Sequence, residues 1–454
     1  MENSLIAAVA TAPARSGIGI VRLSGEGAAS AAGAVFIAAD GKALAEHAPH
    51  TRVYGALHDT AGRTIDHILA TWSRAPHSFT GEETAELQCH GSPVVLTLAL
   101  EALFAQGARQ AGPGEFTRRA FLNGRLDLAQ AEAVIDLIDA ETPGAVRQAA
   151  GQLSGALSRR VGEIYDGLVD VMAHFHAVLD YPDEDIGPFE NEQLRAGLEL
   201  ARGRIRSLLD SYASGRVVAR GVPCAIVGSP NVGKSTLLNA LVGYERAIVT
   251  DIPGTTRDTV EERCMLGGVL LRLIDTAGLR ETEDAVERIG VERSRAAMEQ
   301  AGLIFVVADQ SVGLTDEDLA LVSQAQALAP TVLVWNKSDL SSAPVPEGEG
   351  LPPVVELSAR EGRGMDRLGE LVAQLLPAGG DEEGSLLTNA RQADAARRAL
   401  EAVERADEAQ AMGITPDAVL TDVEEALSAL GELTGRSVRE DITARIFSRF
   451  CVGK

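Results

Sequence analysis

The sequence predicts a multidomain chain in which a doubly wound, mostly parallel α/β domain is inserted into an all-α helical domain and is preceded by an α+β domain. At 454 residues the chain is too long for one hydrophobic core. Residues 222–376 alternate apolar strand-like runs with helical patterns, as a doubly wound sheet requires. Ala- and Leu-rich helical patterns flank this region on both sides. The predicted segments are 1–118 (α+β), 119–216 (first helical part), 217–378 (α/β) and 379–454 (second helical part).

Each predicted segment has its own pattern. Up to about residue 114, short β-like runs such as residues 19–23 alternate with Gly- and Pro-rich turns. From about residue 116 to about 214, turn signals are rare and apolar residues recur with a helical period. Because a loose stretch at 377–385 leads into the second helical part, we expect the two helical parts to pack together around the inserted domain. The strands predicted in that domain lie at residues 224–227, 270–274, 303–308, 331–335 and 354–357.

Composition and charge exclude several classes of protein. Hydrophobic residues make up 45% and charged residues 23%, the balance of an ordinary globular protein. No apolar run reaches the roughly 18 residues of a membrane helix, and the first ten residues lack the basic start of a secretion signal, so we expect a cytoplasmic protein that does not bind membranes. The four cysteines lie far apart, which favours free thiols over a zinc site or disulfides. A net charge of -24 opposes unspecific attraction to nucleic acid, so any RNA contact must be local.

A glycine-rich loop with the sequence GSPNVGKS occupies residues 228–235, between a predicted strand and a predicted helix. In such a loop the backbone N–H groups cradle phosphates at the helix N-terminus, Lys234 meets the β- and γ-phosphates, and Ser235 is a magnesium ligand. The expected nucleotide contacts in this loop are Asn231, Val232, Gly233, Lys234, Ser235 and Thr236.

Three further elements follow in order, each at the end of a predicted strand. Asp275, Thr276, Ala277 and Gly278 would approach the magnesium ion and the γ-phosphate. In Asn336-Lys337-Ser-Asp339 the carboxylate of Asp339 can accept from N1–H and N2–H of guanine, a donor pair that adenine lacks. Ser358, Ala359 and Arg360 fit a contact to the guanine oxygen. These elements together predict a GTP-hydrolysing switch protein.

The residue after Gly278 is Leu279, where a Gln usually orients the attacking water. Another group must therefore orient this water, and its candidates lie in the acidic stretch 281–287.

Strings along the whole chain resemble the MnmE family, also called TrmE, of bacterial tRNA modification GTPases. These strings are GIGIVRLSG at 17–25, FTGEE at 79–83, ELQCHG at 86–91, GEFTRRAFLN at 114–123, DIPGTTRD at 251–258, DTAGLR at 275–280 and FCVGK at 450–454. The resemblance implies a potassium-activated GTPase that adds a carboxymethylaminomethyl or aminomethyl group to C5 of the wobble uridine. It implies a homodimer that acts on tRNA in a heterotetramer with the flavoprotein MnmG, with FAD only on that partner. It also implies a folate-binding, dimer-forming first domain, and a reduced folate (5,10-methylene- or 5-formyl-tetrahydrofolate) as cofactor beside GTP, Mg²⁺ and K⁺.

The resemblance also implies roles for single residues of the GTPase domain. Thr256 would join Ser235 on magnesium, and Glu287 would polarise the attacking water, with Glu283 or Asp284 as rivals. Thr256 and Lys234 would complete the catalytic set with Glu287. The potassium ligands would be Asn231 and the backbone carbonyls of Thr250, Ile252 and Thr255. The nucleotide contacts of this segment would be Thr250, Asp251, Ile252, Pro253, Gly254, Thr255 and Thr256.

For the folate, the resemblance implies contacts from Arg22, Glu86, Arg125 and Lys454. Position 125 is Arg where the family often has Lys, which keeps the cation but changes its geometry. Cys451 is a candidate reactive thiol, with inert packing as the alternative. The basic segment 435–454 is a candidate tRNA or partner contact, with a solvated helix face as the alternative.

Two other functions remain open from the sequence. The chain could be a GTP-dependent RNA-binding or ribosome-assembly factor whose flanking domains only dock. Alternatively, it could be a folate enzyme in which GTP hydrolysis is regulatory.

Overall fold

The computed structural model describes most of the chain as two compact units, formed by residues 1–135 with 428–454 and by residues 136–427. The described residues are 4–12, 14–180, 188–244, 262–274, 287–340, 343–376, 384–414, 416–436, 446–448 and 450–453. Of 174–180, 188–191, 287–293 and 416–417 only the backbone is described. The unit borders fall within helices α4 (Leu128–Ile138) and α14 (Pro416–Thr434). The segment boundaries expected from the sequence remain predictions.

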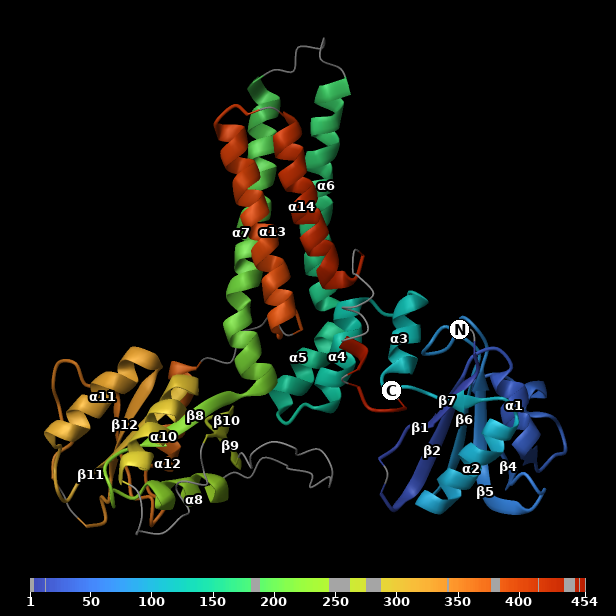
Figure 1. Cartoon of the computed structure of the whole chain (residues 1–454), viewed down its shortest axis with the longest axis horizontal. Helices are drawn as coiled ribbons and strands as arrows, with labels where there is room; N and C mark the ends of the chain where they lie inside the picture. The colour runs from blue at the N-terminus through green and yellow to red at the C-terminus, as the bar shows by residue number, and fades with distance from the viewer. Residues whose placement is uncertain are drawn as a thin grey trace. The chain divides into compact units, whose positions relative to one another are not determined.

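A seven-stranded sheet in the order β3-β4-β5-β6-β2-β1-β7 forms the centre of the first unit (Figure 1). Neighbouring strands are antiparallel except for β1 and β7, which are parallel. The predicted run at 19–23 lies inside β2. The bounds are β1 Ile6–Val9, β2 Ser16–Ser24, β3 Phe36–Ala38, β4 Val53–His58, β5 Thr64–Ser73, β6 Thr84–Gly91 and β7 Arg109–Gln110.

The two faces of this sheet carry different helices. Because side chains alternate along a strand, Ala7 and Val21 join the core formed with α1 (Ala28–Val35) and α2 (Pro93–Ala105). Ile6 and Ala8 instead pack with Phe116 of α3 (Glu115–Leu122) on the other face. A short 3-10 helix, η1 (Leu44–Glu46), completes the unit. The α+β class expected for this part is confirmed.

The carboxyl-terminal residues pack within the same unit. Phe447 and Phe450 are buried with Ala131 of α4, and their ring centroids lie 5.6 Å apart. Val452 forms an antiparallel bridge with Pro113. The end of the chain therefore contacts the amino-terminal domain.

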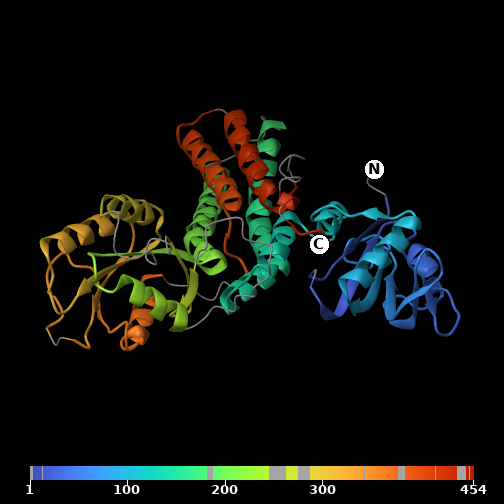
Figure 2. The ribbon, with the colours of Figure 1, turned by 60° about the horizontal axis from the view of Figure 1, so that its bottom comes forward.

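In the second unit, helices from both sides of the inserted domain lie together. Figures 1 and 2 show α13 (Ala390–Ala411) running alongside α7 (Pro188–Arg220), and Arg202 pairs with Asp407 across them at 2.9 Å. Helices α5 (Pro143–Leu153) and α6 (Ala156–Asp180) also contact α7. The expectation that the two helical parts pack together holds for these helices.

The segment that follows the inserted domain, at residues 384–386, is held on α5 by hydrogen bonds. Buried Gln152 donates from Nε2 to the carbonyl of Leu386 at 2.7 Å, and Gln148 accepts from the N–H of Gly384 at 2.7 Å. These bonds satisfy backbone groups that would otherwise be buried without partners.

The inserted domain contains a six-stranded sheet in the order β13-β12-β11-β8-β10-β9. All neighbouring pairs are parallel except β9 with β10. Separate apolar cores on its two faces confirm the doubly wound class. The strands are β8 Val222–Val227, β9 Glu262–Leu266, β10 Val269–Leu273, β11 Leu303–Asp309, β12 Thr331–Asn336 and β13 Val354–Glu356, and the helices are α8 Lys234–Tyr244, α10 Glu287–Gln300, α11 Asp316–Leu328 and α12 Met365–Leu375.

The five strands expected from the sequence are present, and β9 is an additional edge strand. Its sequence ERCML begins with two charged residues, and it is joined to β10 by the turn at Gly267 and Gly268, both with positive φ. A strand covered on only one side tolerates such composition.

Candidate nucleotide and folate sites

The loop at 228–233 leaves β8 and enters α8, as the strand-loop-helix pattern predicts. Gly228 and Gly233 have φ values of 151° and 100°. A Cβ at Gly228 would lie 2.3 Å from the carbonyl oxygen of Val307, and one at Gly233 would lie 2.3 Å from Nδ2 of Asn336. The loop therefore needs glycine at both positions, because the backbone conformation and the close neighbours exclude a side chain.

Lys234 begins α8 and reaches back over the loop. Its Nζ donates to the carbonyls of Gly228 at 2.9 Å and Ser229 at 2.7 Å. Burial lowers the pKa of Lys234 below its ordinary value. The ammonium and the amides of the first helical turn, which includes Ser235 and Thr236, form the donor set that nucleotide phosphates require. The residues present thus fit a triphosphate with its magnesium ion.

Asn336, the last residue of β12, connects this loop to the guanine side of the site. Its side chain is 2% exposed. Nδ2 donates to the carbonyl of Val232 at 2.9 Å, and Oδ1 accepts from the N–H of Ala359 at 3.0 Å. The side-chain amide of Asn336 therefore links the loop at 228–233 to the loop at 358–360.

Lys337 holds the same loop at the carbonyl of the neighbouring residue, Asn231. Its Nζ donates to the carbonyl of Asn231 at 2.7 Å and pairs with Oδ2 of Asp309 at 2.6 Å. Burial opposes ionisation of Asp309, but hydrogen bonds from Lys337 and Ser311 keep the pKa of Asp309 below its ordinary value. The carboxylate thus remains a counter-ion for Lys337 at neutral pH.

Asp339 lies beside the loop at 358–360. The hydroxyl of Ser358, which is fully buried, donates to Oδ1 of Asp339 at 2.7 Å. This hydrogen bond is the main reason that the pKa of Asp339 is lowered. An ionised carboxylate next to Ala359 and Arg360 fits the expected recognition of guanine.

The structure thus brings the loops after β8, β12 and β13 to one edge of the sheet, since parallel strands end on the same side. Several expected residues lie outside the described part of the chain. These are Thr250, Asp251, Ile252, Pro253, Gly254, Thr255, Thr256, Asp275, Thr276, Ala277, Gly278, Glu283, Asp284 and Lys454. Glu287 is the first residue of α10, but its side chain is not described. The roles expected for these residues stay predictions.

Sequence reasoning missed Asp318, a buried carboxylate in the first turn of α11. Its Oδ1 accepts from the hydroxyl of Ser229 at 2.8 Å, and its Oδ2 accepts from the hydroxyl and the N–H of Thr315. The spacing Thr-x-x-Asp is typical of a capping box and could have indicated the helix start. No sequence pattern pointed to the bond with Ser229.

In the first unit, Arg22 and Glu86 form an ion pair between β2 and β6 at 2.8 Å. The Arg22 guanidinium lies 5.9 Å from the ring centroid of Phe116. Both charged side chains are about one quarter exposed, at 25% and 27%. A partly exposed cation and anion beside an aromatic ring can hydrogen-bond a planar polar ligand. Exposed Arg125 lies against Gly81, on the loop after β5.

All four cysteines are free, as expected. Burial raises the pKa of the thiols of Cys89 and Cys264 to about 12 and that of Cys224 well above its ordinary range. Cys451 is exposed. In the basic segment, Ile446 is half-buried and Arg436 is exposed, whereas Arg439, Arg445 and Arg449 lie outside the described residues.

Among the described residues, no helix is long and apolar enough to cross a membrane. The same part of the chain holds no cluster of three or more His, Cys, Asp and Glu side chains placed to bind a metal ion.

Comparison with known proteins covers the whole chain. Residues 5–125 match the family model described as the GTP-binding protein TrmE N-terminus, and residues 128–451 match the MnmE helical domain. Proteins named tRNA modification GTPase MnmE from Heliobacterium modesticaldum and Symbiobacterium thermophilum are each 45% identical, with 100% of both chains covered. The relative of the same name from Chloroflexus aurantiacus is also 45% identical over 100% of both chains.

Solved structures match a smaller part of the chain. A variant of Aquifex aeolicus Era bound to GDP.AlF4- is 27% identical, covers 40% of this chain and 66% of its own, and has a TM-score of 0.27. The FeoB G-domain from Methanococcus jannaschii is 25% identical, covers 34% and 97%, and has a TM-score of 0.25.

Proposed function

Because this chain belongs to the MnmE family of tRNA modification GTPases, we propose that it hydrolyses GTP as part of the modification of the wobble uridine in certain tRNAs. The observation that carries the proposal is the relationship over the full length of the chain, at 45% identity. The meeting of the loops at 228–235, 336–339 and 358–360 supports it, because these loops supply the groups that a guanine nucleotide needs.

In the hydrolysis step, Lys234 and the amides of its loop hold the triphosphate, and Asp339 selects guanine. Ser235 and Thr256 would hold Mg²⁺, which neutralises charge on the β- and γ-phosphate oxygens. Glu287 would take up the role of the missing Gln by polarising the attacking water, since Leu279 cannot do so. Glu283 and Asp284 are the rivals for this role.

We further propose activation by K⁺. Asn231 is exposed and has φ 63°, and its backbone carbonyl is engaged by Lys337. Its side-chain oxygen is therefore the group that can serve as a hard ligand for the ion, together with the carbonyls of Thr250, Ile252 and Thr255. Hydrolysis should be markedly slower in sodium than in potassium at equal ionic strength, and equal rates would reject this part of the proposal.

For the modification step we propose a homodimer that works in the cytoplasm with a flavoprotein partner of the MnmG type, in a heterotetramer. A reduced folate would provide the one-carbon unit from a site that includes Arg22, Glu86, Arg125 and Lys454. The product would be a carboxymethylaminomethyl or aminomethyl group on C5 of the uridine. The partly exposed Arg22–Glu86 pair beside Phe116 supports this site.

The experiment that tests the function is analysis of tRNA nucleosides by mass spectrometry. Bulk tRNA from a strain lacking this protein should lack the modified wobble uridine, and the wild-type chain should restore it. A matched strain carrying Asp339→Asn should not restore it. Unchanged wobble uridine in the deletion strain would instead favour a GTP-dependent RNA-binding or ribosome-assembly factor.

The folate site is tested separately by calorimetry. Purified protein should bind 5-formyl-tetrahydrofolate, and Arg22→Ala should abolish this binding. The control is Arg63→Ala, which removes a guanidinium of the same domain that is 81% exposed and pairs locally with Asp59. No binding to the wild-type chain would remove the folate proposal and leave the GTPase proposal standing.

A further inference from the structure

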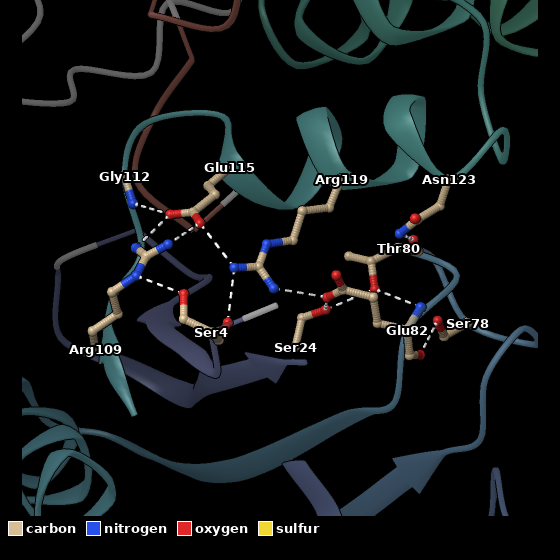
Figure 3. Close-up of polar contacts among 10 residues, drawn as sticks. All are labelled: Ser4, Ser24, Ser78, Thr80, Glu82, Arg109, Gly112, Glu115, Arg119 and Asn123. Atoms are coloured by element: carbon tan, nitrogen blue, oxygen red, sulfur yellow. Dashed lines mark hydrogen bonds and ion pairs between the residues drawn. The ribbon is translucent and has the colours of Figure 1, made fainter. Parts of the chain in front are cut away.

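Two sequence motifs to which the proposed function gives no role, at 79–83 and 114–123, meet in a partly buried group of charges. We call this group the α3 ion cluster; it consists of Glu82, Arg109, Glu115 and Arg119 (Figure 3). Arg119 is 5% exposed, and it donates to Glu82 at 2.9 Å, to Glu115 at 3.0 Å and to the carbonyl of Ser4 at 2.8 Å. A guanidinium buried to this extent requires such partners, because removing one partner leaves a charge uncompensated.

Glu115 is the centre of the α3 ion cluster. Its Oε2 accepts from the N–H of Gly112 at 2.8 Å and from Nη1 of Arg109 at 2.9 Å, and its Oε1 accepts from Arg109 and Arg119. Partial burial opposes ionisation, but these hydrogen bonds, from Arg109 first, lower the pKa of Glu115 to about 2. The carboxylate therefore fixes the backbone at Gly112 throughout the neutral pH range.

The loop fixed in this way, residues 112–114, is the surface on which the end of the chain lies, and we call it the tail seat. Gly114 has φ 62°, and a Cβ there would lie 2.6 Å from the carbonyl oxygen of Phe447 and 2.9 Å from Cβ of Phe450. Its N–H donates to the carbonyl of Cys451 at 3.3 Å, and Pro113 bridges Val452. Any shift of the tail seat would break these contacts.

From the tail seat the chain runs to the strand beside Arg22. A Cβ at Gly453 would lie 2.2 Å from the carbonyl oxygen of Val9, so its backbone lies directly on the end of β1. Val9 pairs with Val21, the residue before Arg22. Phe116, one residue after Glu115, lies under the Arg22 guanidinium. The α3 ion cluster, the tail seat and the Arg22–Glu86 pair thus share one face of the sheet.

The other end of the α3 ion cluster holds the loop at 78–83. Glu82 accepts from the hydroxyl of Ser24 at 2.7 Å, and that hydroxyl lies 2.7 Å from the hydroxyl of Thr80. Asn123 of α3's C-cap donates to the carbonyl of Thr80 at 2.8 Å. The same loop contains Gly81, against which Arg125 lies.

We propose that Glu115 and Arg119 are positioning residues that hold the tail seat, and that through it they keep the tail, residues 450–453, on the sheet face that carries the Arg22–Glu86 pair. A ligand bound at this pair would then also contact the tail. The identity of that ligand as a reduced folate rests on the proposed function. The placement of the tail by Glu115 does not rest on it.

The first test is hydrogen exchange of the full-length protein, read in peptides covering 110–118 and 447–453. Glu115→Gln keeps the shape of the side chain but loses its charge, so we expect exchange in both peptides to rise roughly tenfold, as for loss of a charge-assisted hydrogen bond. The matched control is Asp59→Asn. Asp59 also accepts from both backbone and guanidinium donors, namely the N–H groups of Ala61 and Arg63 and the side chain of Arg63, and its replacement should leave both peptides unchanged. Unchanged exchange in Glu115→Gln would overturn the proposal.

The second test separates positioning from general weakening of the domain. Phe450→Ala releases the tail directly, and calorimetry with 5-formyl-tetrahydrofolate should then show about the same loss of affinity as Glu115→Gln. The double variant should bind as weakly as either single variant, because both act through the tail. Losses that add in the double variant would overturn the proposal.

Two further readouts keep these outcomes distinct. If Glu115→Gln does not fold, Arg109→Gln replaces it, because this change removes the Arg109–Glu115 ion pair and keeps the Arg119–Glu115 pair. Hydrogen exchange in the same two peptides should then rise in Arg109→Gln. Should the wild-type chain bind no reduced folate, the folate proposal fails, and the exchange experiment alone decides the role of Glu115. Retained GTP affinity in each variant shows that the second unit is folded.

Discussion

The side chain of Asn336 donates a hydrogen bond to the carbonyl of Val232 at 2.9 Å, between two loops that lie 104 residues apart in the sequence. Its Oδ1 accepts a hydrogen bond from the N–H of Ala359. A residue expected to touch the nucleotide therefore also holds together the two loops that surround it.

Asn336→Ala should weaken both the fold and nucleotide binding. The change leaves the carbonyl of Val232 and the N–H of Ala359 buried without this partner, at a cost of about 1–3 kcal/mol for each group. We expect the melting temperature of the protein to fall by several degrees, at about 2–4 °C per kcal/mol, together with GTP affinity. Thr331→Val, which removes a buried hydroxyl bonded to the carbonyl of Ala329 at the other end of β12, is the control that should keep GTP affinity. Wild-type GTP affinity in Asn336→Ala would contradict the bridging role.

Asp339→Asn should remove the preference for guanine. The amide loses one acceptor and gains a donor facing N1–H and N2–H, so we expect at least roughly a tenfold loss of GTP affinity, as for a buried hydrogen-bonding mismatch. Competition of labelled GTP by ATP and by GTP measures the preference. Because the pKa of Asp339 is lowered by Ser358, binding to the wild-type protein should persist as the pH falls to about 4. An unchanged ratio of GTP to ATP affinity in the variant would contradict the assignment.

Glu287→Ala should lower turnover far more than binding. If the carboxylate polarises the attacking water, its loss should reduce kcat by about 10²–10⁴ with little change in the dissociation constant for GTP. Single-turnover hydrolysis and equilibrium binding measure the two quantities. Glu283→Ala and Asp284→Ala are the matched variants, and a larger kcat loss in either would transfer the role to that residue.

Gly384→Ala should destabilise the junction at which the chain returns from the inserted domain to the helices. Gly384 has φ 87°, and a Cβ there would lie 2.4 Å from Cα of Gly151 on α5. Gly413→Ala is the control, since its φ is 68° but no atom lies within 4 Å of its Cβ position. The control isolates the cost of the backbone conformation, about 1–2 kcal/mol, from the cost of the collision. Thermal unfolding should show the lower melting temperature in Gly384→Ala, and equal values would contradict the close packing at α5.

The stabilisation contributed by Glu115 should depend on pH in a defined direction. Its pKa is lowered from 4.5 to about 2, so its contribution is complete above about pH 4.5 and is lost as the pH falls through about 2. The difference in melting temperature between the wild type and Glu115→Gln should therefore be largest near neutral pH and shrink toward about pH 2. Thermal scans from neutral pH down to about pH 2.5 measure it, and a difference that grows on acidification would contradict the ion pairing.

Most of the architecture was accessible from the sequence. The five strands of the inserted domain were predicted within one or two residues, because parallel strands covered on both faces are mostly apolar runs. The edge strand β9 was missed, since it begins with two charged residues and its apolar run is only three residues long. The positions of Lys234, Asn336 and Asp339 could also be expected, because Asn336 ends a strand and the other two lie at or after the loop that follows one, at the carboxyl edge of the sheet where ligands bind.

By itself, the sequence determined the order of the nucleotide motifs, the fold class and the family, since these depend on residues that are neighbours along the chain and on local backbone chemistry. Only the tertiary structure decided that Asp318 holds Ser229, that Asn336 holds Val232 and that the backbone at Gly453 lies on β1. These contacts join residues that are 89 to more than 400 positions apart. Their formation depends on how sheets and helices pack, for which a single sequence contains no periodic or local signal.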